Sequence, residues 1–324
     1  MRTVGYSTGY APAVVRRPKV VGEVLSFKPV TLSAIPVLRG YMERSASRAN
    51  DFSIGGLLMW AEYFHYEYCI HNDTLFVKGV SEVNPELPAF SLPVGKMGLR
   101  ESVGLIVDYC RRAGIAPRLS AVPEDRLEEL ADVTPGRIEE LTDWSDYIYD
   151  AEALASLSGK KLSKKRNHVN RFMVDNPGYR FEPLTGGNLP AVREAYMSWL
   201  GGEASAALDA ASAIEESAQT LSVMDNMDAY GFEGAVLYDG RGRIVAFTMG
   251  EVIGDTLYTH IEKMDHGVAG AGETVNKLFA EMMTGRHPSL RYINREEDAG
   301  DEGLRKAKLS YHPAIILKKY DVVL

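Results

Sequence analysis

Residues 256–265 (TLYTHIEKMD) form a predicted strand whose side chains are suited to proton transfer. Alternation along a strand places Tyr258, His260 and Glu262 on one face. A carboxyl group withdrawn from water can have its pKa raised into the range of a useful base. Glu262 is therefore a candidate to deprotonate or anchor an amine, with His260 beside it. The alternative is an edge strand whose polar face is simply hydrated.

A second set of candidate catalytic residues lies in the stretch 292–313 (YINREEDAGDEGLRKAKLSYHP). Asn294 and Glu296 share a face of the strand predicted at its start. If the neighbouring strands diverge there, both side chains point to the same cleft as Glu262. The helix that follows ends with Tyr311, whose phenol is suited to donate a proton to a leaving thiolate or alkoxide.

The charged residues of this stretch allow two interpretations. In the functional one, Arg305 and Lys308 help to bind a donor. In the other, the stretch is a lattice of surface salt bridges between its acidic and basic side chains. The residues of that lattice are Glu296, Glu297, Asp298, Asp301, Arg305, Lys306 and Lys308. The sequence leaves both interpretations open.

Three glycines, Gly267, Gly270 and Gly272, lead into a helix predicted at 273–283. A glycine-rich turn that opens a helix presents backbone N–H groups at the positive end of the helix dipole, which suits a phosphate group. We therefore expect these glycines to hold the phosphate of a donor. The competing interpretation is that they serve the geometry of the turn alone.

The segment 159–172 (GKKLSKKRNHVNRF) is the densest positive cluster of the sequence. Lys164, Lys165 and Arg166 are candidates to bind a phosphate-rich ligand, either the end of a tRNA or a nucleotide cofactor. The formal net charge of the whole chain is −8, which argues against wholesale binding of nucleic acid or anionic lipid but not against a local basic surface. The competing interpretation is a solvated helix face.

The composition excludes several classes of protein. With 324 residues, 45% of them hydrophobic, the chain is long enough for two globular domains. Its two cysteines fit neither a metal-binding nor a disulfide pattern, and no Walker loop, HExxH motif or Ser-His-Asp order occurs, so we expect no metal. No run of eighteen apolar residues is present, and we expect a cytoplasmic protein without an integral membrane segment.

The order of the predicted elements indicates an α+β fold with a mixed sheet. In the second half, a strand and two helical stretches precede a three-stranded antiparallel meander with short Gly-containing connections. A helix, a strand, a short helix and a last strand follow. Strands are expected at 179–184, 232–239, 243–253, 256–265, 290–297 and 314–324, and helices at 153–176, 189–200, 205–226, 273–283 and 302–311. In the first half, residues 54–70 are expected to be a helix that runs into a strand, and residues 99–114 a helix that ends at a glycine.

This order resembles the GNAT acyltransferase fold. The sequence also resembles uncharacterised soluble proteins grouped with the C-terminal domain of phosphatidylglycerol lysyltransferase, relatives of the Fem-type aminoacyltransferases. The resemblance runs over most of the chain and is carried by residues 146–172, 247–251, 259–265 and 292–313. It implies two tandem GNAT-like domains, each a central, mostly antiparallel sheet flanked by helices. We expect a flexible leader at 1–22, an N-terminal domain at 23–150, and a C-terminal domain with the active cleft at 151–324.

The resemblance implies transfer of an acyl or aminoacyl group to the amine or hydroxyl group of a small molecule or peptide. GNAT enzymes carry Arg or Gln before the glycines of the loop that binds acyl-coenzyme A, whereas this chain has Asp265-His266-Gly267. The donor therefore stays open between acyl-coenzyme A and aminoacyl-tRNA. A second hypothesis is a non-catalytic GNAT-fold module that binds RNA or a nucleotide through residues 160–171.

Overall fold

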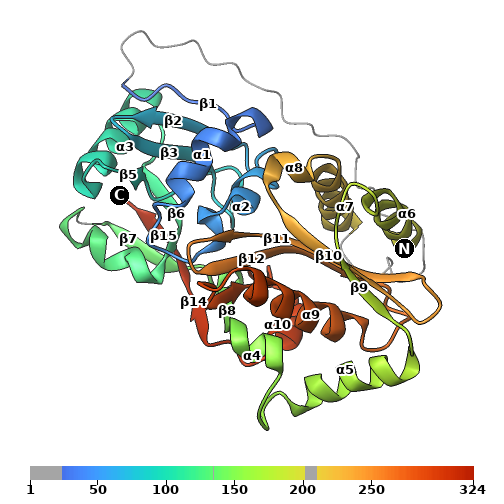
Figure 1. Cartoon of the computed structure of the whole chain (residues 1–324). Helices are drawn as coiled ribbons and strands as arrows, with labels where there is room; N and C mark the ends of the chain where they lie inside the picture. The colour runs from blue at the N-terminus through green and yellow to red at the C-terminus, as the bar shows by residue number, and fades with distance from the viewer. Residues whose placement is uncertain (1–23, 134, 201–209) are drawn as a thin grey trace, which may run out of the picture.

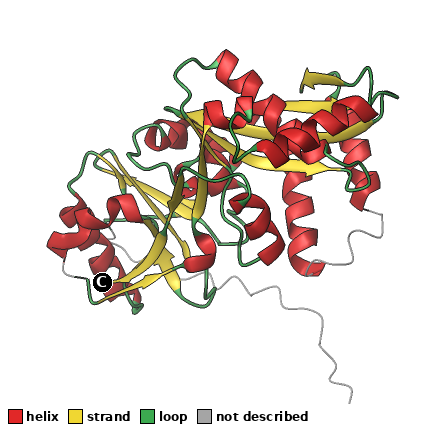
Figure 2. Cartoon of the chain, turned by 90° about the horizontal axis from the view of Figure 1, so that it is seen from below, coloured by secondary structure: helices red, strands yellow, loops and turns green. Residues whose placement is uncertain are grey.

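The structure is a computed structural model that describes residues 24–133, 135–200 and 210–324. The predicted leader at 1–22 lies outside the described residues. Two sheets form the centre of the molecule, and helices flank both of them (Figures 1 and 2). The strand pairs are mostly antiparallel, and a parallel pair lies within each sheet. These features confirm the predicted α+β fold.

The first sheet is built mainly from the first half of the chain. Its strands run in the order β1-β2-β3-β4-β6-β15-β7, with β5 paired to β3. Their bounds are β1 Lys28–Pro29, β2 Glu67–His71, β3 Thr74–Val80, β4 Pro88–Phe90, β5 Val94–Gly95, β6 Arg118–Pro123, β7 Arg137–Glu140 and β15 Lys319–Val323. The α-helices of this half are α1 Ile35–Met42, α2 Ile54–Leu58 and α3 Leu99–Ala113. Short 3-10 helices lie at Leu32–Ala34, Asn50–Phe52, Glu124–Val133 and Thr142–Trp144.

The second sheet is built mainly from the second half. Its strands run in the order β14-β8-β13-β12-β11-β10-β9. Their bounds are β8 Asp146–Asp150, β9 Arg180–Pro183, β10 Glu233–Tyr238, β11 Ile244–Ile253, β12 Thr256–Met264, β13 Tyr292–Asn294 and β14 Ile315–Leu317. The helices are α4 Ala151–Ser156, α5 Ser163–Asp175, α6 Leu189–Leu200, α7 Ala210–Asp225, α8 Met227–Tyr230, α9 Ala271–Arg286 and α10 Glu302–Leu309. The predicted meander is confirmed as β10, β11 and β12.

Each half of the chain contributes its final strand to the sheet of the other half. β8 follows β7 in the sequence but lies in the second sheet, between β13 and β14. β15 follows β14 but lies in the first sheet, between β6 and β7. Each sheet therefore takes one strand from the other side of the division predicted at residue 150.

Three predicted elements are more divided than the sequence pattern indicated. The helix predicted at 153–176 is two helices, because Leu157 and Gly159 have positive φ angles of 49° and 78° that end α4 before α5 begins. The strand predicted at 314–324 is two strands, β14 and β15, which lie in different sheets. In the segment 54–70 the α-helix is confined to α2, and turns lead from it to β2.

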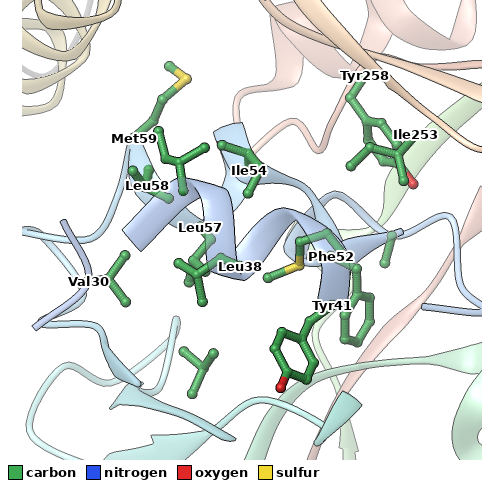
Figure 3. Close-up of a cluster of buried hydrophobic side chains, with 14 of the residues drawn as sticks. Val30, Leu38, Tyr41, Phe52, Ile54, Leu57, Leu58, Met59, Ile253 and Tyr258 are labelled. Carbon is green, nitrogen blue, oxygen red and sulfur yellow. The ribbon is translucent and has the colours of Figure 1, made fainter. Parts of the chain in front are cut away.

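A continuous hydrophobic core joins the two halves. It combines side chains of α1 and α2 with side chains of β11 and β12, as Figure 3 shows for Ile54, Ile253 and Tyr258. Ile54 is fully buried and Tyr258 nearly so. Because burial contributes roughly 25 cal/mol per Å² of apolar surface, this shared core stabilises the contact between the halves as well as each half.

Candidate functional site

Two neighbouring strands of the second sheet diverge near its middle. β12 and β13 pair in parallel only from Thr256 and Tyr292 to Tyr258 and Asn294. The chain after β13 then follows β8 instead: the Arg295 N–H donates to the Tyr147 carbonyl at 3.0 Å, and the Tyr147 N–H donates to the Glu296 carbonyl at 3.2 Å. We call the region between β12 after Tyr258 and residues 295–297 the strand wedge. Charged side chains from its two sides meet across it.

A β-bulge at His260 decides which side chains share a face. In the ladder with β11, Gly250 pairs with Thr259 and Met249 pairs with Ile261, so His260 has no partner. The extra residue reverses the alternation that follows it. Ile261 therefore packs in the same buried cluster as Tyr258, whereas Glu262 contacts α9 on the opposite face. The expectation that His260 and Glu262 lie on one face is wrong for this reason.

His260 is fully buried between two carboxylates. Its Nδ1 lies 2.8 Å from Glu296 Oε1, and its Nε2 lies 3.1 Å from Glu251 Oε1. Its ring stacks on that of Phe232, with centroids 5.0 Å apart. Burial opposes the charged ring, but the hydrogen bonds and charges of Glu251 and Glu296 outweigh it and raise the pKa of His260 to about 9. The imidazole is therefore protonated at neutral pH.

Glu251 is a central member of the site that sequence reasoning did not select. Its side chain is 1% exposed, and its Oε1 also accepts a hydrogen bond of 2.7 Å from the Gly55 N–H at the start of α2. Its Oε2 lies 3.4 Å from Nη1 of Arg39 on α1. The available signal was a single carboxylate within the otherwise uncharged strand 244–253. A buried charge in such a place requires partners.

Glu262 meets a second set of partners on the opposite face of the sheet. Its Oε1 accepts from Nη2 of Arg295 at 2.7 Å, and its Oε2 accepts from Nδ2 of Asn276 at 3.0 Å. Both carboxylate oxygens thus have protein donors. Sequence reasoning missed Arg295 and Asn276. Arg295 was placed opposite Asn294 and Glu296, and only the bulge brings Glu262 to its side.

Tyr311 packs beside this ion pair. Its side chain is 6% exposed, and the guanidinium carbon of Arg295 lies 4.9 Å from its ring centroid. Nζ of Lys165 lies 4.1 Å from the same centroid. Burial raises the pKa of the Tyr311 hydroxyl well above its usual value near 10. The phenol therefore stays protonated at neutral pH, and its hydroxyl can donate a hydrogen bond.

Asn294 and Glu296 do not point toward Glu262 as expected. Nδ2 of Asn294 donates to the Arg48 carbonyl at 2.8 Å and to Oδ2 of Asp146 at 2.9 Å, and Asn294 is fully buried. Glu296 contacts His260. The structure thus divides the predicted catalytic residues between two faces, with His260, Asn294 and Glu296 on one and Glu262 on the other.

The two basic residues assigned to donor binding in α10 are engaged by the protein. Nη2 of Arg305 lies 2.6 Å from Asp298 and 2.7 Å from Asp143. Nζ of Lys308 donates to the carbonyl of Arg295 at 2.6 Å and also to that of Glu297. Burial lowers the pKa of Lys308. Arg305 fits the salt-bridge interpretation, whereas Lys308 fixes the backbone on one side of the strand wedge.

The three basic residues selected in the segment 159–172 have different surroundings. Lys164 is exposed on α5. Lys165 lies over Tyr311 and 3.4 Å from Glu273 of α9. Nη1 of Arg166 donates to the carbonyls of Leu157, at 2.5 Å, and Gly159, at 3.2 Å. Of these three residues, only Lys165 contacts Tyr311, which lies beside the strand wedge.

The glycine turn before α9 has clear geometric roles. Gly270 has a φ of 80°, and a Cβ there would lie 2.6 Å from the carbonyl oxygen of His168, so glycine lets α5 approach α9. A Cβ on Gly272 would lie 2.5 Å from the sulfur of Met264. The Gly267 N–H already donates to Oδ1 of Asp265 at 2.8 Å. A donor phosphate at this turn stays a prediction, and it would have to displace that carboxylate.

In the part of the chain that the structure describes, no group of three or more His, Cys, Asp or Glu side chains is arranged to hold a metal ion. None of the helices in residues 24–133, 135–200 and 210–324 combines the length and apolarity needed to cross a membrane.

Residues 42–323 match the family described as "Phosphatidylglycerol lysyltransferase, C-terminal". The chain belongs to this family. A curated relative, an uncharacterised protein of Mycoplasmoides gallisepticum, is 24% identical over 177 residues, which are 54% of this chain and 55% of that protein. The chain thus spans about half the length of that relative.

Solved structures share the fold over nearly the whole chain. A conserved protein of unknown function from Bacteroides thetaiotaomicron has a TM-score of 0.85 and 31% identity, covering 93% of this chain and 99% of that one. L-PGS from Bacillus licheniformis has a TM-score of 0.60 and 16% identity, covering 89% and 91%. FemX has a TM-score of 0.55 and 12% identity, covering 92% and 97%. At these last two identities the likeness concerns the fold alone.

Proposed function

We propose that the protein transfers an aminoacyl or acyl group at the strand wedge. The observation that carries the proposal is the divergence of two parallel strands in a transferase-type fold, with an acid and a base meeting across the gap on both faces of the sheet. Membership of the lysyltransferase-related family supports the same class of reaction.

In this proposal Glu296 receives the proton of the acceptor. Its side chain is 21% exposed, whereas those of His260 and Glu251 are 0% and 1% exposed. Its φ of 60° is rare for a residue with a side chain, and such strained backbone is common at functional sites. The nitrogen or oxygen of the acceptor attacks the acyl carbonyl, and its proton passes to Glu296. His260 orients that carboxylate.

Tyr311 and the Glu262–Arg295 pair have roles at the donor. As the bond from the acyl carbon to the donor oxygen or sulfur breaks, the leaving atom takes the Tyr311 proton. The charge of Arg295, held by Glu262, lies beside the phenol and favours the negative charge that develops there. Glu262 itself positions groups in this proposal, since both of its oxygens already have donors.

Aminoacyl-tRNA is the donor that we favour over acyl-coenzyme A. Asp265 occupies the amide of Gly267, and its negative charge disfavours a coenzyme A phosphate at that turn. Exposed Lys160, Lys161 and Lys164 lie at or before the start of α5 and suit an RNA backbone. The proposed acceptor is an amine or hydroxyl group of a small molecule or peptide.

The test compares donors and one substitution. Purified protein is incubated with radiolabelled aminoacyl-tRNA or acetyl-coenzyme A and a mixture of amine and hydroxyl acceptors, and acceptor-dependent release of the label from the donor is measured. We expect release from aminoacyl-tRNA, reduced at least about 100-fold by Glu296→Gln. Glu302→Gln, which alters an exposed carboxylate outside the strand wedge, is the matched control. Full activity of Glu296→Gln would remove Glu296 from the mechanism.

A second candidate function is non-catalytic binding of RNA or a nucleotide through residues 160–171. The exposed Lys160, Lys161 and Lys164 favour it, since the described residues include no ion-pair partner within 4.0 Å of any of the three. Binding would then weaken steeply with salt and be lost in a triple alanine variant. An affinity that is independent of salt would exclude this candidate.

A further inference from the structure

The imidazole of His260 lies where three segments distant in sequence meet. One ring nitrogen faces Glu251 of β11, and the other faces Glu296 in the segment after β13. The start of α2, from the first half of the chain, packs directly on the ring, since a Cβ on Gly55 would lie 2.4 Å from its Cδ2. Glu251 also accepts from the Gly55 N–H at 2.7 Å. His260 and Glu251 thus connect both halves of the molecule to the strand wedge.

The hydrogen-bond chemistry at this point fixes the protonation of the ring. An ionised carboxylate only accepts hydrogen bonds, and a neutral imidazole has a single N–H to donate. The separations of 2.8 Å to Glu296 and 3.1 Å to Glu251 are both hydrogen-bond distances, so both bonds require a ring that carries two N–H groups. A neutral ring would leave one of the two carboxylates without its donor.

We propose that His260 is a proton-dependent clamp whose doubly protonated ring joins β11, α2 and the 295–297 segment and thereby positions Glu296. The clamp itself is independent of the reaction, and only the positioning of Glu296 for transfer rests on the proposed function. His260 and Glu251 are positioning residues here, because neither is exposed enough to touch a substrate.

The groups around the ring agree with a clamp that holds at neutral pH. Glu251 faces it from β11, Glu296 from the 295–297 segment, and Tyr258 from β12 with its ring centroid 6.3 Å away. α1 contributes Arg39, which reaches the ring only through Glu251. α2 presents the backbone of Gly55, and the residue before β10 presents the apolar ring of Phe232. The carboxylates outweigh burial and raise the pKa of His260 to about 9.

Loss of the ring proton would release one of the two bonds. Glu296 is the partner that can turn to water, because its side chain is 21% exposed and that of Glu251 is 1% exposed. The 295–297 segment, which carries Arg295 as well as Glu296, would then lose its side-chain link to α2 through Glu251 and keep its backbone bonds to Tyr147. The proposed reaction would lose its oriented base in an alkaline range where free histidine side chains are already neutral.

The test uses the titration of histidine rings in the full chain by carbon–proton NMR between pH 5.5 and about 10.5. The His260 signal is assigned by its absence in His260→Asn or, if that variant does not fold, by replacing the other histidines one at a time. We expect His260 to titrate near pH 9 in the wild type. In Glu251→Gln we expect proton binding at least about tenfold weaker, and in the control Glu302→Gln no change.

Hydrogen exchange supplies a second readout. Across the titration, peptides covering 52–58 and 293–299 should lose protection together, beyond the intrinsic effect of pH on exchange, while peptides from β9 and β10 should not. A His260 pKa at or below its ordinary value of 6.5 would overturn the proposal, as would a titration unaffected by Glu251→Gln or unchanged exchange. None of these measurements uses turnover. A negative result would therefore exclude the clamp without excluding the proposed transferase activity, which its own assay tests.

Discussion

Each sheet contains a short parallel pair of strands. The carboxylates beside the two pairs differ in how many of them have a donor from another segment of the chain. Next to β4 and β6 of the first sheet lies a small cavity whose lining includes the polar side chains of Asp51, Tyr66 and Glu82. Burial raises the pKa of the Glu82 carboxyl well above its usual range. In the strand wedge of the second sheet, each carboxylate has a donor from another segment of the chain.

The difference indicates which region is suited to chemistry. Beside the first pair, the basic residue is Lys319, whose side chain is 2% exposed. Its Nζ lies 2.7 Å from Asp51 and 2.9 Å from Asp146, the first residue of β8 in the second sheet. Such a closed cluster has a structural role. The strand wedge has paired charges and partly exposed acids, with Glu296 at 21% and Glu262 at 15%, and it adjoins the protonated phenol of Tyr311. A shared fold thus yields one structural cluster and one candidate reaction site.

The largest expected effect comes from removing the base of the first region. Lys319→Met leaves the buried Asp146 and the partly buried Asp51 without their cation, and breaking a buried ion pair costs roughly 3–5 kcal/mol. Urea denaturation measures the free energy of unfolding. Lys318→Met, at the neighbouring exposed position, is the matched control and should change little. Equal effects of the two substitutions would contradict the contrast drawn between the two regions.

The second prediction concerns pH, which acts in the same direction on Glu297, where the strand wedge meets Lys319, and on His260. Burial raises the pKa of Glu297, which lies 3.9 Å from Lys319, to about 7, and the carboxylates around His260 raise its pKa to about 9. Because both pKa values are higher in the folded state, the stabilisation is complete below the ordinary values of 4.5 and 6.5. It is lost as pH rises through 7 and then 9.

Thermal unfolding between about pH 5 and 9.5 measures this loss, which for His260 is on the order of 3 kcal/mol. Glu297→Gln should flatten the lower part of the profile and Glu251→Gln the upper part. Stability that increases over this range would show that other groups dominate and that neither region titrates as inferred.

A smaller effect is expected where the two halves touch at the strand wedge. Gly55→Ala places a methyl group 2.4 Å from the ring of His260, and such overpacking costs typically 1–3 kcal/mol. The control is Gly104→Ala in α3, where no atom lies within 4 Å and the change should be neutral or stabilising. Similar stability of the two variants would mean that α2 does not pack on His260 as described.

The smallest effect on stability is expected on the exposed surface of α5. Lys164→Ala removes a charge that contacts solvent, so the midpoint of unfolding should not change measurably. The same variant should weaken RNA binding and reduce its salt dependence by about one unit of slope. Unchanged RNA affinity would remove this surface from both proposed functions.

The sequence predicted the regular elements better than it predicted their partners. The meander was predictable because its strands alternate and its connections contain glycine, and α3 because its apolar residues share one helix face and Gly114 follows. The bulge at His260 was not predictable from the sequence. A bulge is defined by the pairing with the neighbouring strand, and the residue pattern of one strand alone does not show which residue is unpaired. It alone moved Glu262 to another face and joined it to Arg295.

Contacts between segments that are distant in sequence were still harder to predict. Glu251 stood in a strand with no charged neighbour; its partner His260 lies on the next strand, but Arg39 of α1 and Gly55 of α2 are far away in sequence. The exchange of β8 and β15 could not be read from either strand, because the apolar residues of both suit either sheet. Such contacts depend on which surfaces pack together in the folded chain, and the local hydrophobic pattern of the sequence does not contain this information.

The exchange of final strands also constrains how the chain is made. During synthesis β6 and β7 emerge early, but the strand that lies between them, β15, is translated only after the whole second sheet. The first half therefore leaves the ribosome without the strand between β6 and β7. The unpaired edges of these two strands can form non-native strand pairs until β15 has been translated. Ribosome-bound chains that stop before β15 should accordingly need chaperone protection, and the N-terminal half should reach its native protection last.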